Sequence, residues 1–210
     1  MTDYKKPDYW QLKARKEGYP ARSVYKLMEI DEKFGFFNKT PIRALDLGAA
    51  PGSWSLYALR KMGGKGFLAA CDLAPLSPDF DNNLKNHGIL NRENFLFFQG
   101  DFTAAKTRET LSEKGPYSII MSDAAPATTG NHTVDAARSL NLAEEVIGYA
   151  ENTLAAGGNL AVKVFQSGDS AALLKQIGKL FKTVKTYKPR ACRGSSVETY
   201  YIGIERLNRT

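Results

Sequence analysis

The stretch from Ala44 to Trp54, with the sequence ALDLGAAPGSW, constrains the fold of this chain more than any other. An apolar strand ends there in a carboxylate and runs into a turn with Gly48 and Gly52, and the turn opens a helix. In an open α/β sheet, ligands bind beyond the carboxyl ends of the strands, where glycines let backbone N–H groups come close to them. The motif therefore predicts a cradle for a nucleoside-type cofactor.

A second carboxylate, Asp72, closes the next apolar strand, which we expect at residues 66–71. It follows Gly52 by about 20 residues, the spacing at which an acidic residue in βαβ cofactor sites meets ribose hydroxyls. A glycine turn alone is a weak signal, because many strand-to-helix turns carry glycine for steric reasons. The two features together favour a cofactor site that includes Gly48, Gly52 and Asp72.

Strand and helix patterns alternate along most of the chain. This alternation predicts an α/β fold with a mostly parallel, doubly wound, seven-stranded sheet and an antiparallel final strand. Only the loop 189–197 separates the last two strands, so we expect them to pair antiparallel at or near one edge of the sheet. Helices at 8–17 and 23–31 precede the sheet, and we expect Ser23 to be the N-cap of the second. The expected strands are 43–47, 66–71, 94–99, 117–122, 159–165, 183–188 and 199–205, and the expected core helices are 54–62, 80–86, 103–112, 134–154 and 170–181.

The composition is ordinary for a globular protein. The chain has 210 residues, 43% of them hydrophobic and 24% charged, which predicts one domain over residues 1–210. Its apolar runs are too short to span a membrane and its start is polar, so we expect a cytoplasmic protein without a signal peptide. The only cysteines are Cys71 and Cys192, and there are two histidines. We therefore expect neither a metal site nor a disulfide.

The formal net charge of +7 is unevenly distributed. Residues 170–197 contain basic residues from Lys175 to Arg193 and no acidic residue, a single-sign run typical of proteins that bind polyanions. Residues 1–40 add basic side chains interleaved with Tyr and Trp, which can stack on unpaired bases or pack within amphipathic helices. We therefore expect a nucleic acid as partner, with residues 1–40 as a helical extension that contacts it.

Three charged residues fall at or near the carboxyl ends of predicted strands: Asp101, Asp123 and Lys163. Lys163 is unusual because apolar residues flank it in a central strand, where a buried lysine is costly unless it is paired. If the last strand is antiparallel, Glu198 at its start lies at the same edge, beside Asp123 and Lys163, and offers a partner for Lys163. The alternative is that Lys163 only reaches the edge of the sheet and that Glu198 only faces solvent.

With their neighbours, these residues make the chain resemble the FtsJ-type (RrmJ-like) ribosomal RNA ribose 2′-O-methyltransferases, which use S-adenosylmethionine on a Rossmann-like sheet. The similar segments extend over nearly the whole chain and keep every charged residue of the site. Small departures exist, such as Ser53 and Ala124 where relatives often carry Gly and Met. The segments are ARSVYKL (21–27), DLGAAPGSW (46–54), CDL (71–73), QGDF (99–102), MSDAAP (121–126), VKVFQ (162–166) and SVETY (196–200).

The resemblance implies a catalytic Lys-Asp-Lys-Glu tetrad, which falls on Lys26, Asp123, Lys163 and Glu198. Spacing alone does not single out Lys26. The implied cofactor is S-adenosylmethionine. Its implied contacts are Gly52, Trp54, Asp72, Asp101 and Asp123, beside the Gly48 already noted.

The expected function is 2′-O-methylation of a ribose, expected to be that of a uridine, in large-subunit (23S-type) ribosomal RNA, either naked or within an assembled subunit. We expect a monomer that needs no metal. Alternatives are a tRNA ribose methyltransferase of the same family, an RNA-binding assembly factor without catalysis, and a nicotinamide-dependent dehydrogenase. The dehydrogenase accounts for the glycine turn and the distal acid, but not for Lys163, Glu198 or the basic run. Whether Lys163 accepts the proton of the ribose hydroxyl or orients the hydroxyl as a cation stays open.

Overall fold

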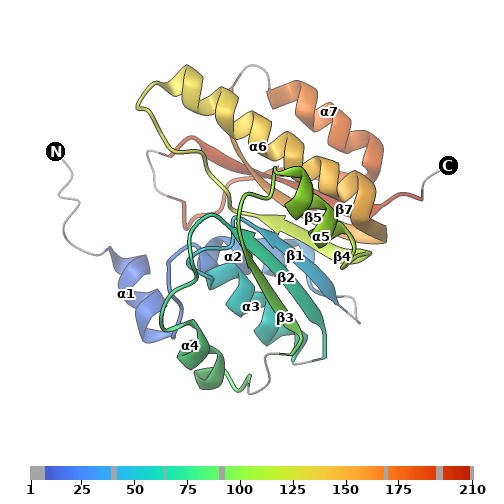
Figure 1. The fold of residues 1–210 in the computed structure, drawn as a ribbon. Helices are drawn as coiled ribbons and strands as arrows, with labels where there is room; N and C mark the ends of the chain where they lie inside the picture. Colours follow the sequence, from blue (N-terminus) through green and yellow to red (C-terminus); the bar gives the residue numbers. More distant parts are fainter. Residues whose placement is uncertain are drawn as a thin grey trace.

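The computed structural model of this chain describes residues 8–38, 42–63, 65–89, 93–167, 170–192 and 196–208. Within these ranges, seven strands form one sheet in the order β3-β2-β1-β4-β5-β7-β6 (Figure 1). The pairs β1–β2, β2–β3, β1–β4 and β4–β5 are parallel, whereas β7 runs antiparallel to both β5 and β6. The predicted α/β fold is confirmed, as is the antiparallel pairing of the last two strands at one edge.

Every predicted helix and strand is present, and the largest difference is at β5. This strand begins five residues before its predicted start. The start was predicted too late because Gly157 and Gly158 suggest a turn. The chain instead stays extended there, and its pairing with β4 shifts register between Tyr117 and Ile119. The strands are β1 (Arg43–Leu47), β2 (Phe67–Asp72), β3 (Phe95–Gln99), β4 (Tyr117–Ser122), β5 (Leu154–Phe165), β6 (Phe181–Tyr187) and β7 (Glu198–Arg206). The helices are α1 (Tyr9–Lys16), α2 (Val24–Phe34), α3 (Ser53–Met62), α4 (Phe80–Asn86), α5 (Ala105–Ser112), α6 (His132–Thr153) and α7 (Ser170–Leu180).

Helices cover both faces of the sheet, with α1 to α4 on one face and α5 to α7 on the other (Figure 1). Residues of β1 alternate between the two hydrophobic cores: Ala44 packs with the α2 and α3 side, and Leu45 packs with the α6 side. Both faces of the central strands are therefore dry, as in other doubly wound sheets. The strand ends and the loops that follow them are left to form a site.

The segment that connects α1 and α2 is held by specific contacts. Asp8 caps α1 and forms a capping box with Gln11, and Gly35 ends α2 in the left-handed conformation. Ser23 precedes α2 as predicted but does not cap it, because its own backbone is already helical and its side chain makes no capping hydrogen bond. Its carbonyl oxygen instead accepts a hydrogen bond from the indole nitrogen of Trp54 at 2.8 Å.

Cys71 and Cys192 are both buried free thiols. In the described ranges, no group of three or more His, Cys, Asp and Glu side chains could hold a metal ion. Among the helices described, none is long and apolar enough to cross a membrane.

Candidate active site

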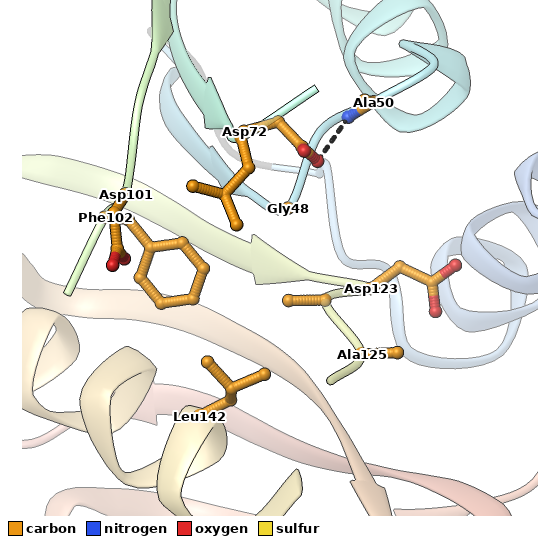
Figure 2. Close-up of a pocket in the computed structure, with 10 residues that line it drawn as sticks. Gly48, Ala50, Asp72, Asp101, Phe102, Asp123, Ala125 and Leu142 are labelled. Carbon is orange, nitrogen blue, oxygen red and sulfur yellow. Dashed lines mark hydrogen bonds between the residues drawn. The ribbon is translucent and has the colours of Figure 1, made fainter. Parts of the chain in front are cut away.

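The first cavity of the site lies beyond the carboxyl ends of β1, β2 and β4, and its volume is about 260 Å³ (Figure 2). Gly48, just after β1, forms part of its wall with a positive φ of 81°. A Cβ at this position would lie 2.6 Å from the Cβ of Ala124 in the loop after β4. Only glycine therefore lets these two loops pack against each other and keep the cavity in shape.

Asp72 and Asp101 present carboxylates to this cavity. The two oxygens of Asp72 accept hydrogen bonds from the backbone N–H groups of Ala50 and Ala74, each at 2.8 Å, and Figure 2 shows the first of these bonds. One oxygen of Asp101 accepts from the backbone and the hydroxyl of Thr103, both at 2.8 Å. Each carboxylate oxygen has lone pairs left, so both side chains can also accept hydrogen bonds from a ligand.

The lining of the first cavity fits S-adenosylmethionine. Among the described residues that line it, three are aspartates and none is Lys or Arg, which favours a ligand with positive charge. S-adenosylmethionine carries a sulfonium and an ammonium, whereas the dinucleotide of a dehydrogenase carries a pyrophosphate. Leu73, Phe102 and Leu142 add apolar surface suited to a purine ring.

Two residues expected to contact the cofactor lie behind the wall of this cavity. Gly52 has φ of 109°, and a Cβ there would lie 2.6 Å from the ring of Phe80, so tight packing requires this glycine. Trp54 is 2% exposed and packs in the core, with its indole N–H bonded to Ser23. Neither residue is among the described residues that line the cavity, and their direct contact with the cofactor stays a prediction.

The four residues of the expected tetrad meet in one cluster. The Lys26 Nζ lies 2.9 Å from a carboxylate oxygen of Glu198 and 3.5 Å from Oδ1 of Asp123. The Lys163 Nζ lies 3.1 Å from the same Oδ1 and donates to the backbone carbonyl of Asp123 at 2.5 Å. Figure 2 shows the Asp123 carboxylate turned away from Asp72 and Asp101. Asp123 thus borders the first cavity while its carboxylate binds the lysines.

Strand register explains why Glu198 joins the cluster. In the antiparallel ladder, Lys163 of β5 pairs with Tyr200 of β7, and Phe165 pairs with Glu198. Side chains two residues apart on a strand share a face, so Glu198, Tyr200 and Lys163 lie on the same side of the sheet. The prediction that an antiparallel last strand brings Glu198 to this edge is confirmed.

Tyr200 was not expected in the site. It is fully buried, and its hydroxyl donates a hydrogen bond to Oδ1 of Asp123 at 2.5 Å. Its ring centroid lies 5.8 Å from that of Trp54 and 5.8 Å from the Lys26 Nζ. The signal in the sequence was its position two residues after Glu198, which places both on one face of a strand.

Charges in the cluster determine which groups stay ionised. Burial alone would lower the pKa of Lys26, but the carboxylates of Asp123 and Glu198 raise that pKa above its ordinary value. Burial would raise the pKa of Asp123, but Lys163 and Lys26 lower it below its ordinary value. Burial raises the pKa of the Tyr200 hydroxyl well above its usual range, and Asp123 adds to this effect. At neutral pH, Lys26 is therefore a cation, Asp123 an anion and Tyr200 a hydrogen-bond donor.

A second cavity of about 250 Å³ lies against the cluster, and Lys26 and Glu198 both line it. Asp123 lines the first cavity, so the ion pairs from Asp123 to Lys26 and from Lys26 to Glu198 connect the two. Arg22 also lines the second cavity, pairs with Asp8 and donates to the carbonyl of Ala191 at 2.5 Å. Arg22 was another residue that spacing and motifs did not select.

The loop that closes the second cavity is held by Glu29 of α2. Its carboxylate accepts hydrogen bonds from the backbone N–H groups of Arg190 and Ala191, both at 2.9 Å, and from the hydroxyl of Tyr187 at 3.1 Å. Glu29 and Arg22 together fix the loop after β6 against α2. Ala191, which lines the second cavity, is thus held against α2 by hydrogen bonds.

The predicted basic run does not form one surface. Lys175 and Lys179 are exposed on α7, which covers the far face of the sheet from α2. Lys182 is the second residue of β6, at the end away from the cluster, and pairs with Glu205 at 3.1 Å. Lys188 follows β6 at the end near the cluster, because Tyr187 pairs with Tyr200. Arg193 lies outside the described residues.

Residues 19–206 match the model of the FtsJ-like methyltransferases. The chain belongs to the FtsJ-like methyltransferase family. The expected class of enzyme, a methyltransferase, is thereby confirmed. The chain is 48% identical to a protein named ribosomal RNA large subunit methyltransferase E from Treponema denticola, over 96% of both chains. It is 44% identical to the protein of the same name from Oleidesulfovibrio alaskensis, over 94% of this chain and 90% of that one.

Solved structures show the same fold. A ribosomal RNA methyltransferase described as putative, from Plasmodium falciparum, superposes with a TM-score of 0.75 at 27% identity, over 91% of this chain and all of that one. Human methyltransferase-like protein 13, solved in complex with SAH, superposes with a TM-score of 0.55 at 15% identity, over 93% of this chain and 81% of that one. The second similarity is one of fold alone.

Proposed function

We propose that this enzyme transfers a methyl group from S-adenosylmethionine to the 2′-oxygen of a ribose in large-subunit (23S-type) ribosomal RNA. The main support is the cluster of Lys26, Asp123, Lys163 and Glu198 between an aspartate-lined cavity and a second cavity. The named relatives support the choice of large-subunit RNA over tRNA. The acidic lining of the first cavity argues against a dehydrogenase.

The first cavity holds and orients the methyl donor. When bound, S-adenosylmethionine supplies a methyl group on a positively charged sulfur that is ready for in-line displacement. Asp72 and Asp101 accept hydrogen bonds from ribose hydroxyls or the ammonium group of this ligand, and Leu73, Phe102 and Leu142 pack against its apolar parts. This arrangement leaves positioning as the main task of the protein.

The second cavity receives the target ribose. Lys26 and Glu198 line it as a fixed ion pair, and Arg22 supplies a further cation. Glu198 and Asp123 keep Lys26 protonated. As a fixed cation that donates hydrogen bonds, Lys26 orients the ribose and does not take its proton. The target hydroxyl then meets Lys163, whose Nζ lies 3.1 Å from Oδ1 of Asp123, a residue that lines the first cavity.

Lys163 is the residue that handles the hydroxyl proton. Its nitrogen is held by the carbonyl and carboxylate of Asp123, which occupy two of its hydrogen-bonding directions. In the neutral amine the remaining direction is a lone pair that accepts the ribose proton, and in the cation it is an N–H that orients the oxygen. We propose the role of proton acceptor, with Asp123 as the group that orients the amine.

A methyl-transfer assay tests this function. Purified protein and S-adenosylmethionine with a labelled methyl group are incubated with naked large-subunit RNA, assembled large subunits and tRNA, and ribose methylation is then mapped. With the wild-type protein we expect 2′-O-methylation of one ribose in large-subunit RNA, that of a uridine. With the Lys163→Ala variant we expect no methylated ribose. Label in tRNA alone, on a base, or nowhere would contradict the proposal, and the last result would favour an assembly factor.

The comparison of naked RNA with assembled subunits also decides which form is the substrate. A monomeric state, a cytoplasmic location and independence from metal stay predictions. They are checked by light scattering, by fractionation of cells and by assays in the presence of a chelator.

A further inference from the structure

A third hollow, of about 470 Å³, lies outside the two cavities of the catalytic cluster. Arg15 of α1 forms one side of it, the turn at Gly18 to Pro20 forms its base, and α4 forms the other side. The ring of Tyr19 in this turn stacks on His87 just after α4, with centroids 4.8 Å apart, and so fixes the turn to the helix. The hollow is therefore a built feature of the fold that joins two distant segments of the chain.

Asparagines dominate the α4 side of this hollow. Three of the seven residues of α4 are Asn82, Asn83 and Asn86, although asparagine is a weak helix former. Phe80 and Leu84, 2% and 3% exposed, hold the helix to the core instead. In the described part of the chain, the three side-chain amides make no hydrogen bond to another group. The helix thus carries weak helix formers on the side that lines the hollow, where their amides are available to a ligand.

The chemistry of the hollow suits a nucleobase. Each amide offers donors and an acceptor, the combination that pairs with the edges of bases, and the planar guanidinium of Arg15 can stack on a base. Asp79 also lines the hollow and offsets the charge of Arg15, so the described lining has no net positive charge to attract a phosphate. The lining therefore favours a base over the backbone of a nucleic acid.

The hollow and the second cavity are close together along the chain. Pro20 lines the hollow and Arg22 lines the second cavity, and the Cα atoms of these two residues are at most about 7 Å apart. Ala21 between them is fixed, because its N–H donates to the Ser53 hydroxyl at 2.7 Å and its carbonyl accepts from it at 3.1 Å. A single strand covers such a distance in about one or two nucleotides.

We propose that this hollow binds the base of an unpaired RNA nucleotide one or two positions from the methylated ribose. The inference rests on the proposed function, because it needs an RNA whose target ribose occupies the second cavity. The free amides then select the flanking base by hydrogen bonds, and the stacked turn at Tyr19 sets its distance from the cluster. The enzyme's preference for a particular base next to the target nucleotide would then arise from this hollow and not from the charged cluster.

A triple variant tests the proposal: Asn82→Ala, Asn83→Ala and Asn86→Ala together. Alanine favours helix, so α4 should form at least as well, and thermal unfolding checks this. We expect the KM for the RNA to rise about tenfold, with kcat and the affinity for S-adenosylmethionine unchanged. The matched control is Asn208→Ala, which removes an amide from a hollow formed by residues near the ends of β6 and β7, and it should leave the KM within about twofold.

Synthetic RNA then identifies the bound group. The methylated ribose is first mapped with the wild-type protein, and absence of methylation at this step contradicts the proposed function and not the role of the hollow. Single abasic nucleotides are next placed at each position within two of that ribose. One abasic RNA should raise the wild-type KM as the triple variant does, with no further rise when the two changes are combined. An unchanged KM for the triple variant, or additive effects at every abasic position, would overturn the proposal.

Discussion

Asp46 lies on β1 and Asp123 lies just beyond the neighbouring strand β4, yet their pKa values move in opposite directions. Asp46 of β1 is fully buried beneath the cofactor cavity, and one of its oxygens accepts from the Ser55 hydroxyl at 2.7 Å. Its other oxygen has no hydrogen-bond partner in the described part of the chain. Burial raises the pKa of Asp46 to about 7, and the charges of Asp123 and Asp72 add to this. Near neutral pH, this carboxyl is therefore partly protonated.

Asp123, just beyond β4, has 16% of its side chain exposed and is nevertheless an anion. Burial would raise its pKa, but Lys163 and Lys26 lower it below its ordinary value. The difference between the two residues shows that ion pairing, and not depth alone, decides the charge of a carboxylate in this sheet. The region around Asp46 therefore contains a buried, partly neutral acid, whereas the region around Asp123 contains a set of ion pairs.

The largest expected effect comes from breaking the ionic region at Lys163. Lys163→Ala removes the group that contacts both the carbonyl and the carboxylate of Asp123. We expect methyl transfer to fall by a factor of about 10²–10⁴, the range typical of lost proton transfer. Single-turnover assays with saturating cofactor and RNA measure this, and calorimetry should show an unchanged affinity for S-adenosylmethionine.

Two further variants show whether transfer needs the amine of Lys163 itself or only a positive charge. Lys163→Arg keeps a cation but should not restore transfer, because a planar guanidinium cannot replace a compact amine or accept a proton. Lys179→Ala, on the exposed face of α7, should retain wild-type rates. Near-normal turnover by Lys163→Ala would assign this lysine to structure alone.

A second prediction concerns the unpaired acid, Asp46. Its folded-state pKa is about 7, above the ordinary value of 3.8, so the folded protein keeps a proton that the unfolded chain has released. The free energy of unfolding should therefore fall as pH rises from about 4 to about 7, and stay level above that range. Asp46→Asn removes this fall. Relative to wild type, the variant should gain about 3 kcal/mol between pH 5 and pH 8.

Denaturant unfolding of both proteins at both pH values measures this gain. Subtracting the free energies of unfolding of the two proteins removes the contributions of the other titrating groups, which both proteins share. Asparagine keeps the size of the side chain and an acceptor for Ser55, so the core should stay packed. Parallel pH curves for the two proteins would show that Asp46 ionises normally. That result would also mean that the pKa values of Asp46 and Asp123 do not move in opposite directions.

Most of the fold could be predicted from the sequence, because local patterns determine where each strand and helix lies. Alternating apolar segments predicted all seven strands, and the short loop before the last strand predicted its antiparallel pairing. The start of β5 could not be predicted, since Gly157 and Gly158 suggest a turn where neighbouring strands keep the chain extended. Tertiary pairing overrides propensity there.

The site was predictable only where its residues follow from strand order. Gly48, Asp72 and Asp101 lie at or just beyond the ends of neighbouring strands, and the position of Glu198 follows from the antiparallel register. Lys26 lies on a helix outside the sheet, so only family resemblance suggested it. Tyr200 and Arg22 reach the cluster through packing that no local pattern shows, and the same packing places Gly52 and Trp54 behind the cavity wall.

A third prediction concerns Asp72, which differs from both Asp46 and Asp123 because its carboxylate faces a cavity and accepts hydrogen bonds from two backbone N–H groups. Asp72→Ala should weaken S-adenosylmethionine binding by about 2 kcal/mol, because charge-assisted hydrogen bonds to the ligand are lost. Asp72→Asn keeps an acceptor and should lose less. Calorimetry showing equal affinities for all three proteins would exclude Asp72 from cofactor binding.

The smallest expected effect compares two lysines at the two ends of β6. Lys188 lies near the cluster, whereas Lys182 is about 20 Å away along the strand and is already paired with Glu205. Lys188→Ala should weaken RNA binding and reduce the slope of log affinity against log salt by about 0.7–0.9, as expected for one lost phosphate contact. The Lys188 Nζ also donates to the carbonyl of Ser196 at 2.7 Å, but loss of that bond alone would lower affinity equally at every salt concentration. Lys182→Ala should leave both affinity and slope unchanged, and equal slopes for the two variants would show that the end of β6 near the cluster does not contact RNA.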